Sequence, residues 1–413
     1  MITVLLWLCL GGLWVTGVYG FYQVAVSLRF LGELPALPDP DERHRFAILV
    51  FARNEERVIG QLLESLRNQD YPDQRYQVFV TADNCTDATA AVARAGGAVV
   101  YERSSQAATG KGAALTWFFA EHAPVGFDAC VVFDADNVVD PGFLAAMNRQ
   151  LAAGHPIAAG YRMGKNPSSS WVAGASTLFW LMQTRFFHLP RARRNLPCTT
   201  VGGTGFMFAL SVLGSDGWHT RSASEDIEFT LNAIADGWFV ALAPDAIFYD
   251  EQPLTLVQSL QQRYRWSVGS VQLLPTVLPR LAGGLGEGRL RTIDAVLYSV
   301  GVIVGGLSGV LWLISLGLGV LAGADVGQVL VMMAVSTVLG YLVMAAFAVL
   351  VLRLERRTWP GVTRAILGFP VWLFSWSLIN MLVVFYRDPT WRVLPHTEAL
   401  SLAETTRPGS ARP

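Results

Sequence analysis

The chain has 413 residues, of which 52% are hydrophobic and only 15% are charged, whereas a soluble domain carries about 25% charged residues. Part of the chain is therefore expected to lie in lipid. The formal net charge of -1 excludes a nucleic-acid-binding protein with a strongly basic surface, and the 11% aromatic content excludes a disordered chain. The four cysteines form no CxxC pair, so they indicate neither a zinc site nor a disulfide framework, and a reducing compartment is expected.

The N-terminal segment, residues 2–28, is uncharged and long enough to cross the roughly 30 Å hydrocarbon core of a bilayer as a helix. A cleaved signal peptide is the alternative, but the segment lacks a basic region before it, is too long, and is followed by no A-x-A site. Arg29, Arg43 and Arg45 come next, so the positive-inside rule places the following domain in the cytoplasm. We predict that residues 1–29 form a transmembrane helix.

Residues 45–250 are predicted to form an α/β domain, because short apolar or β-branched runs alternate with helical stretches. The apolar stretch 170–189 contains Gln183 and Arg185, and we expect it to be a helix of this domain close to the membrane. In such sheets, ligands bind beyond the carboxyl ends of the strands. The expected strands are 46–51, 77–82, 98–101 and 129–134, and the expected helices are 55–68, 86–95 and 110–122.

Acidic residues follow three of the expected strands. Glu55 comes after the first strand, Asp83 after the second, and Asp134 and Asp136 at the end of the fourth. Side chains at i and i+2 of a strand point to the same side, so both aspartates are placed to reach one divalent cation, which prefers carboxylate oxygens. The alternative is that Asp136 begins a turn and caps the helix after Pro141.

Two common nucleotide-binding motifs are absent from the sequence. The first expected strand leads into Ala-Arg-Asn-Glu and not into G-x-G-x-x-G, which excludes a nicotinamide-binding domain. Gly110-Lys111-Gly112 is not a Walker A loop, because Ser105 replaces the first glycine and Gly112 replaces the Ser/Thr. Lys111 nevertheless begins a helix, where it is placed to meet a phosphate; the alternative is a solvated surface lysine.

Two later segments of the domain also carry polar candidates. The glycine-rich run Gly203-Thr204-Gly205 offers accessible backbone to a bulky polar ligand. Glu225 and Asp226 open a helix. There they either stabilise the helix dipole or include a carboxylate that removes a proton from an attacking hydroxyl.

Residues 251–292 are predicted to form amphipathic helices at the membrane surface. Gln262, Arg265 and Trp266 fall at i, i+3 and i+4 of a helix and therefore share one face. An arginine there is able to neutralise a diphosphate, and an indole is able to stack on a sugar ring. The alternative is a purely interfacial helix with an aromatic belt, and both interpretations are compatible.

The C-terminal membrane region is assigned to residues 293–390. Two apolar segments, 295–322 and 326–352, are predicted to be spans joined by a tight turn, and basic residues after them return the chain to the cytoplasm. The last apolar stretch, 365–386, is either a third span or a broken, re-entrant helix, and residues 391–413 form a tail. A full crossing would place three basic side chains outside, against the charge rule: Arg387, Arg392 and His396.

In this order, Asp83, Asp134-Ala135-Asp136, Ser224-Glu225-Asp226 and Gln262-Arg-Tyr-Arg265-Trp266 resemble the D, DxD, [TS]ED, QxxRW series of membrane-bound family 2 glycosyltransferases. This group includes the synthases of cellulose, chitin, hyaluronan and poly-N-acetylglucosamine. The resemblance covers residues 46–269. It implies a GT-A fold, a single Rossmann-like domain that binds a nucleotide diphosphate sugar, and an inverting hexosyltransferase that forms a β-glycosidic bond.

The resemblance also implies roles for individual residues. Asp226 would be the general base with Glu225 beside it, and Asp134 and Asp136 would bind Mg²⁺ or Mn²⁺. The nucleotide sugar, most often a uridine one, would contact Glu55, Asp83, Lys111, Asp134 and Arg265. The acceptor would lie near Gly203, Thr204, Gly205, Gln262 and Trp266.

The sequence departs from the family pattern in three respects. Ser224 stands where threonine is commonest, a small change since either residue caps a helix. Asp83 is preceded by Ala82 and not by a second acid, so it alone would recognise the nucleoside. Three or four membrane helices hardly enclose a polysaccharide channel, so secretion of a product would require a homo-oligomer or a secretion partner.

These observations lead to one expected activity and two alternatives. We expect a multi-pass enzyme of the plasma membrane, with a cytoplasmic catalytic domain, that transfers glucose or N-acetylglucosamine from a UDP-sugar and polymerises it into a glycan. The first alternative is the transfer of one sugar to a membrane lipid, as in ceramide glucosyltransferases. The second is a catalytically inactive scaffold or transporter subunit that only binds nucleotide.

Overall fold

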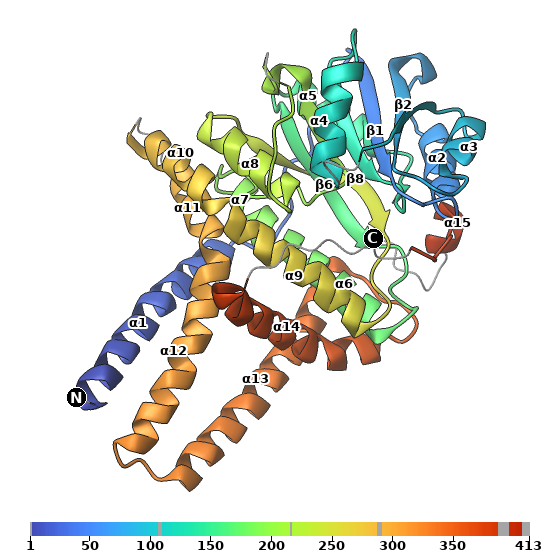
Figure 1. Cartoon of the computed structure of the whole chain (residues 1–413). Helices are drawn as coiled ribbons and strands as arrows, with labels where there is room; N and C mark the ends of the chain where they lie inside the picture. The colour runs from blue at the N-terminus through green and yellow to red at the C-terminus, as the bar shows by residue number, and fades with distance from the viewer. Residues whose placement is uncertain (1, 106–109, 215–216, 287–290, 387–395, 407–413) are drawn as a thin grey trace.

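The computed structural model describes residues 2–105, 110–214, 217–286, 291–386 and 396–406. Its centre is an eight-stranded mixed sheet with the strand order β3-β2-β1-β4-β7-β6-β8-β5 (Figure 1). Strand β7 runs antiparallel to both of its neighbours, whereas β1, β2, β3 and β4 are parallel. The strands are β1 (Phe46–Ala52), β2 (Tyr76–Asp83), β3 (Val99–Arg103), β4 (Ala129–Asp134), β5 (Val138–Val139), β6 (Ile157–Gly164), β7 (Phe206–Ala209) and β8 (Val240–Asp250).

Helices cover both faces of the sheet, and further helices from the N- and C-terminal parts of the chain lie below it (Figure 1). The first ten are α1 (Ile2–Ser27), α2 (Ile59–Arg67), α3 (Thr89–Ala95), α4 (Lys111–His122), α5 (Phe143–Ala152), α6 (Trp171–Met182), α7 (Leu189–Ala192), α8 (Glu225–Ala235), α9 (Leu256–Gln272) and α10 (Leu274–Gly286). They are followed by α11 (Thr292–Ser299), α12 (Gly301–Leu321), α13 (Val326–Glu355), α14 (Val362–Phe385) and α15 (Leu402–Thr405). A π-helical segment, η2 (Gln183–His188), joins α6 to α7, and two short 3₁₀ turns are η1 (Asp73–Arg75) and η3 (Leu210–Val212).

Strand β1 is buried along its whole length because helices pack on both faces of the sheet. Side chains alternate along a strand, so Phe46, Ile48 and Val50 pack with α2, α3 and α5, while the intervening side chains pack with α4, α8, α9 and α10. A strand that is covered on both faces needs apolar side chains at every position. The sequence of β1, which contains no polar residue, agrees with this.

The four predicted strands and the three predicted helices are present, with shifted ends. Helix α2 begins four residues later than expected, because the backbone amides of Val58 and Ile59 both donate to the carbonyl of Glu55 and form a turn there. The expected helix 170–189 is divided into α6, η2 and α7. It packs against α14 and contacts α13.

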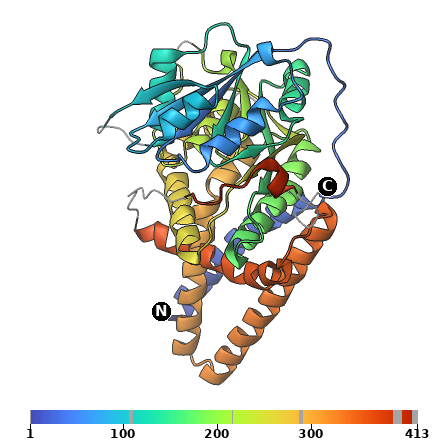
Figure 2. The same ribbon diagram turned by 90° about the vertical axis from the view of Figure 1, so that its right-hand side faces the viewer.

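Four helices are long and apolar enough to cross a membrane: α1, α12, α13 and α14. The first three extend away from the sheet on one side of the molecule (Figures 1 and 2). Helix α1 packs along α12, where the Thr16 hydroxyl donates to Ser308 at 3.2 Å. The three helices therefore expose long apolar surfaces, as a lipid environment requires.

Helix α14 differs from the other three in its direction. It is continuous through Pro370 and lies transverse to α12 and α13, between them and the β-sheet (Figures 1 and 2). The described part of the tail then contacts the α/β domain through His396. The expected break in this helix is therefore wrong, because α14 runs without interruption from Val362 to Phe385, whereas the full crossing and the re-entrant arrangement stay predictions. Arg387 and Arg392 lie outside the described residues.

Candidate active site

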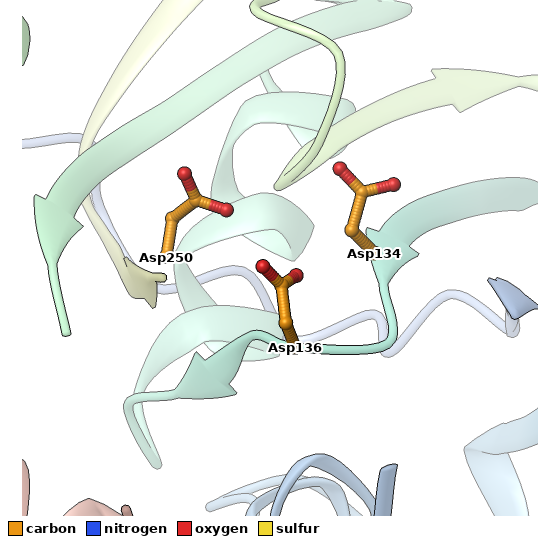
Figure 3. Close-up of side chains that lie close together, drawn as sticks. All are labelled: Asp134, Asp136 and Asp250. Atoms are coloured by element: carbon orange, nitrogen blue, oxygen red, sulfur yellow. The ribbon is translucent and has the colours of Figure 1, made fainter. Parts of the chain in front are cut away.

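Three aspartates converge at the carboxyl ends of neighbouring segments of the sheet. Asp134 ends β4, Asp136 follows in the next turn, and Asp250 ends β8. One carboxylate oxygen of each lies within 4.8 Å of the others, and the three side chains point toward a common space (Figure 3). Asp136 does not cap α5, since Asp140 accepts a hydrogen bond from the Gly142 amide at the start of that helix instead. The predicted pair is thus part of a triad.

The triad is held together by a neutral hydrogen-bond network. The Asn137 side-chain amide donates to Asp250 at 2.8 Å and to Asp136 at 3.2 Å. The Thr204 hydroxyl donates to Asn137 and accepts from the Asp134 amide at 2.9 Å. Thr204 is buried and, like Gly205, does not line the cavity, so of the predicted glycine-rich run only Gly203 is brought to it.

Burial and mutual repulsion change the ionisation of the triad. Burial, together with the neighbouring Asp250 and Asp134, raises the pKa of Asp136 to about 8, although His396 and Lys165 act in the opposite direction. Burial also raises the pKa of Asp250, which Arg162 opposes. Carboxylates that repel one another are stabilised by a shared cation, so the electrostatics favour a divalent ion at this position.

Lys111 is a residue of the site and not a solvated surface lysine. It is the first residue of α4, and its ammonium group donates to Asp134 and, at 2.6 Å, to the carbonyl of Gly203. A Cβ at Gly112 would lie 2.9 Å from the Thr220 hydroxyl and 3.2 Å from Glu225 Cβ, so this glycine allows α4 to approach the start of α8. Lys111 thereby connects the triad with the predicted acceptor loop.

Glu225 and Asp226 are the first two residues of α8 and both line the cavity. The Thr200 hydroxyl donates to Asp226 Oδ2 at 3.4 Å. Removal from water raises the pKa of Asp226, against which Lys111 and Arg162 act. Burial and the adjacent Asp226 raise the pKa of Glu225 to about 7. A carboxylate with a raised pKa that lines a cavity is a suitable general base.

Ser224 does not cap α8 through its side chain, contrary to the expectation from the sequence. Its hydroxyl lies 3.5 Å from the carbonyl of Trp266 on α9. The two segments approach because residue 269 is glycine: a Cβ there would lie 2.2 Å from Ser224 Oγ and 2.7 Å from the Ser224 amide nitrogen. This contact fixes the candidate base relative to α9.

Substituting Gly269→Ala is therefore expected to lower both stability and turnover. The added methyl group forces α8 and α9 apart, and overpacking of this kind costs about 1–3 kcal/mol. Thermal unfolding and initial rates of the purified protein would measure the effect. Gly283→Ala in α10 is a matched control, because a Cβ at Gly283 meets nothing within 4 Å. An unchanged melting temperature and rate in Gly269→Ala would contradict the close approach.

Helix α9 presents the predicted face to the cavity. Gln262, Arg265 and Trp266 all line it, and the Trp266 ring packs at 5.7 Å from that of Trp180 and at 5.8 Å from that of Trp376. A capping box at Thr255 begins the helix. A neighbouring face is anchored by the fully buried Arg263, which donates to the Trp372 carbonyl of α14 at 2.6 Å and stacks on the Trp372 ring. The helix thus lines the cavity with one set of side chains and contacts α14 with another, which is compatible with both interpretations.

Two predicted nucleotide-binding acids already have basic partners. Asp83 is buried at the end of β2 and forms an ion pair with Arg103 at 2.5 Å. Glu55 lies 2.8 Å from the Nδ1 atom of His396. Both acids line the same cavity as the triad.

The cavity that joins these groups has a volume of about 730 Å³. One end contains the triad and the candidate nucleotide-binding acids. The lining also includes Phe187 of η2 and residues of three candidate membrane helices: Tyr19 of α1, Val302 of α12, and Trp376 and Asn380 of α14. The site is thus continuous from the sheet to the helices that are candidates to lie in the membrane.

Of the thirteen site residues predicted from the sequence, all except Thr204 and Gly205 line this cavity. Sequence reasoning assigned no role to Asp250, Arg162 or His396, which also line it. Asp250 had a usable signal, since it ends an apolar strand and is followed by a second acid. Arg162 lies in mid-strand, where its guanidinium group stacks 3.9 Å from the Trp180 ring and donates to the Gly202 carbonyl, and no local pattern marks it.

Comparison with known proteins agrees with this geometry. The sequence model of the family described as glycosyltransferase like family 2 matches residues 44–269, which is more than half of the chain. The chain belongs to this family. Within it, the chain is 28% identical over 239 residues to the probable glycosyltransferase YdaM of Bacillus subtilis, covering 55% of this chain and 56% of YdaM.

A β-monoglucosyldiacylglycerol synthase of Synechocystis sp. is 27% identical over 253 residues, covering 58% of this family 2 chain and 50% of the synthase. The chain therefore spans about half the length of the curated relatives it matches. Among solved structures, the mannosyltransferase PcManGT from Pyrobaculum calidifontis, in complex with GDP-Man and Mn²⁺, matches with a TM-score of 0.61 and 16% identity. The match covers 92% of this chain and 99% of that chain, and it confirms the predicted GT-A fold with terminal helices.

Proposed function

We propose that this family 2 glycosyltransferase transfers a hexose from a nucleotide diphosphate sugar to a hydroxyl group of a membrane lipid, with inversion at the anomeric carbon. The observation that carries the proposal is the continuous cavity, which has a carboxylate triad at one end and membrane-side helices at the other. Of the two acceptors considered from the sequence, a growing glycan and a membrane lipid, we therefore propose the lipid.

The donor end of the cavity fits a hard divalent cation. Asp134, Asp136 and Asp250 supply only oxygen ligands, which suit Mg²⁺ or Mn²⁺ and leave positions for phosphate oxygens. When bound, the cation would neutralise the charge that develops on the departing diphosphate. Lys111 and Arg265 line the same space and add positive charge for this group.

The acceptor chemistry is assigned to Asp226. Its carboxylate takes the proton from the attacking hydroxyl as the new bond forms between the acceptor oxygen and the anomeric carbon. The bond between that carbon and the diphosphate oxygen breaks at the same time, and the nucleotide diphosphate leaves with the electron pair. A single displacement of this kind converts an α-linked donor into a β-glycoside. Asp83 and Glu55 are assigned to the nucleoside side, as the sequence predicts.

A lipid acceptor is supported by the lining of the far end of the cavity. Tyr19, Phe187, Val302 and Trp376 give it apolar walls, and Asn380 adds one polar side chain. This mixture suits a polar headgroup on an apolar body. The printed activity of the Synechocystis relative, a β-monoglucosyldiacylglycerol synthase, is consistent with it. The basic residues after α1 and α13 support a cytoplasmic catalytic domain.

The proposal is tested by a donor and acceptor screen with the full chain in lipid nanodiscs. UDP-glucose, UDP-N-acetylglucosamine and GDP-mannose would be supplied with Mg²⁺ or Mn²⁺, and nucleotide release and labelled product would be followed. We expect a labelled product that partitions into organic solvent and carries one sugar. A water-soluble polymer would instead establish the processive synthesis indicated by the QxxRW motif, and nucleotide binding without turnover would indicate the inactive scaffold.

A further inference from the structure

The described part of the C-terminal tail, residues 396–406, lies against the α/β domain beside the carboxylate triad. This segment follows the last membrane-region helix and is separated from Glu55 by 341 positions in the sequence. Its first residue, His396, lines the cavity. The tail is therefore part of the wall of the site that the preceding section assigns to the donor.

His396 connects two acids of the donor end through its two ring nitrogens. The Nδ1 atom lies 2.8 Å from Glu55 Oε1, and the Nε2 atom lies 3.5 Å from Asp136 Oδ2. Asp136 is a member of the triad, and its side chain is only 4% exposed. The Nδ1 contact is a hydrogen bond, by which Glu55 restricts the ring, and the Nε2 atom lies at ion-pair distance from Asp136, so the ring packs against that carboxylate and limits its orientation.

The backbone of the tail is fixed at the same place by a second, independent contact. The amides of Thr397 and Glu398 donate to the Glu251 carboxylate at 2.9 and 3.3 Å. Glu251 is the neighbour of Asp250 in the sequence and pairs with the buried Lys165 at 3.7 Å. The Lys165 ammonium group donates to the Asp136 carbonyl at 2.7 Å. The tail is thus attached to the residue that follows Asp250 and, through Lys165, to the backbone carbonyl of Asp136.

We propose that the C-terminal tail completes the cation site, with His396 as a positioning residue that orients Asp136 and is itself oriented by Glu55. The inference rests on the proposed function, because it takes the triad to bind Mg²⁺ or Mn²⁺. Hydrogen-bond partners of metal ligands fix ligand orientation, and their loss typically lowers metal affinity by 10- to 100-fold. Glu55 then acts on the cation through the imidazole ring, in addition to its predicted contact with the nucleotide.

The experiment measures Mn²⁺ binding to the full chain in nanodiscs, without nucleotide, by electron paramagnetic resonance. We expect His396→Ala to weaken binding at least about tenfold and His396→Gln, which keeps a donor, to restore part of the loss. Glu55→Gln should also weaken binding, but it should add little in the His396→Ala background, since both residues act through one ring. His155→Ala is the matched control, because His155 pairs with Gln150 away from the cavity.

The outcomes separate this inference from the proposed function. Equal Mn²⁺ affinity in His396→Ala and the unaltered chain, with binding still lost in Asp134→Asn, would overturn the role of His396 and leave the cation site standing. Tighter binding in His396→Ala would also overturn it, because the ring would then compete with the cation. No saturable binding by the unaltered chain would overturn both. Thermal unfolding of each variant would show that the comparison is made between folded proteins.

Discussion

Replacing Asp226 by asparagine is expected to lower kcat by about 10²- to 10⁴-fold, the range that a positioned general base contributes. The amide keeps the shape of the side chain and its contact with Thr200 but cannot take the proton of the acceptor hydroxyl. Nucleotide affinity should change little, because Asp83 and Glu55, which are assigned to the nucleoside, come from other elements. Initial rates of nucleotide release and calorimetric titration with UDP would measure the two effects.

The pH dependence of kcat provides a second test of the same residue. Removal from water raises the pKa of Asp226 above its ordinary value of 3.8. Since the ionised carboxylate is the active form, kcat should fall as the pH decreases through this raised pKa. The adjacent Glu225 titrates together with Asp226, so the fall of kcat at low pH reports the ionisation of both carboxylates. If Asp226→Asn retained the full rate and the same acid limb, Asp226 would not be the base.

Replacing Asp250 by asparagine is expected to lower kcat/KM at least about 100-fold, because a bound cation supplies several kcal/mol of charge stabilisation at the departing diphosphate. The variant removes one carboxylate of the triad while the side chain still fills its place. Activity measured over a range of Mn²⁺ and Mg²⁺ concentrations would show the loss. Higher cation concentration should recover only part of the rate.

The control for this variant lies on the same strand. Asp245 belongs to β8 and pairs with Arg149 at 3.6 Å, and its side chain is 63% exposed. Asp245→Asn should retain the activity and cation dependence of the unaltered chain. A normal cation dependence in Asp250→Asn would show that Asp134 and Asp136 alone bind the ion, as the sequence indicates.

The fold was largely predictable because its signals are local. The first strands of the domain are short apolar runs, and each of β1, β2 and β3 is followed in the sequence by a helix of the domain. The ends of the helices were less predictable, since they depend on particular hydrogen bonds. The turn that delays α2 to Ile59 is made by the Glu55 carbonyl, which no composition pattern reveals.

The site was predictable where its residues follow strands or open helices, as Asp134, Asp136, Glu225 and Asp226 do. Contacts between distant segments were not predictable. His396 reaches Glu55 across 341 positions of sequence, and the approach of α9 to Ser224 depends on the absence of one side chain at Gly269. Such contacts are determined by tertiary packing, and no regular spacing of residues in a single sequence indicates them.

The transverse position of helix α14 limits which acceptor hydroxyl groups can react. It anchors α9 through Arg263, and α9 presents Gln262, Arg265 and Trp266 to the cavity. On the proposed function, α14 rests near the lipid surface, so it sets the height of the reaction centre above the bilayer. The enzyme would then select acceptors by the depth of their hydroxyl group in the bilayer. A hydroxyl at the level of the headgroups would contact Asp226, whereas one among the acyl chains would lie too deep to contact it.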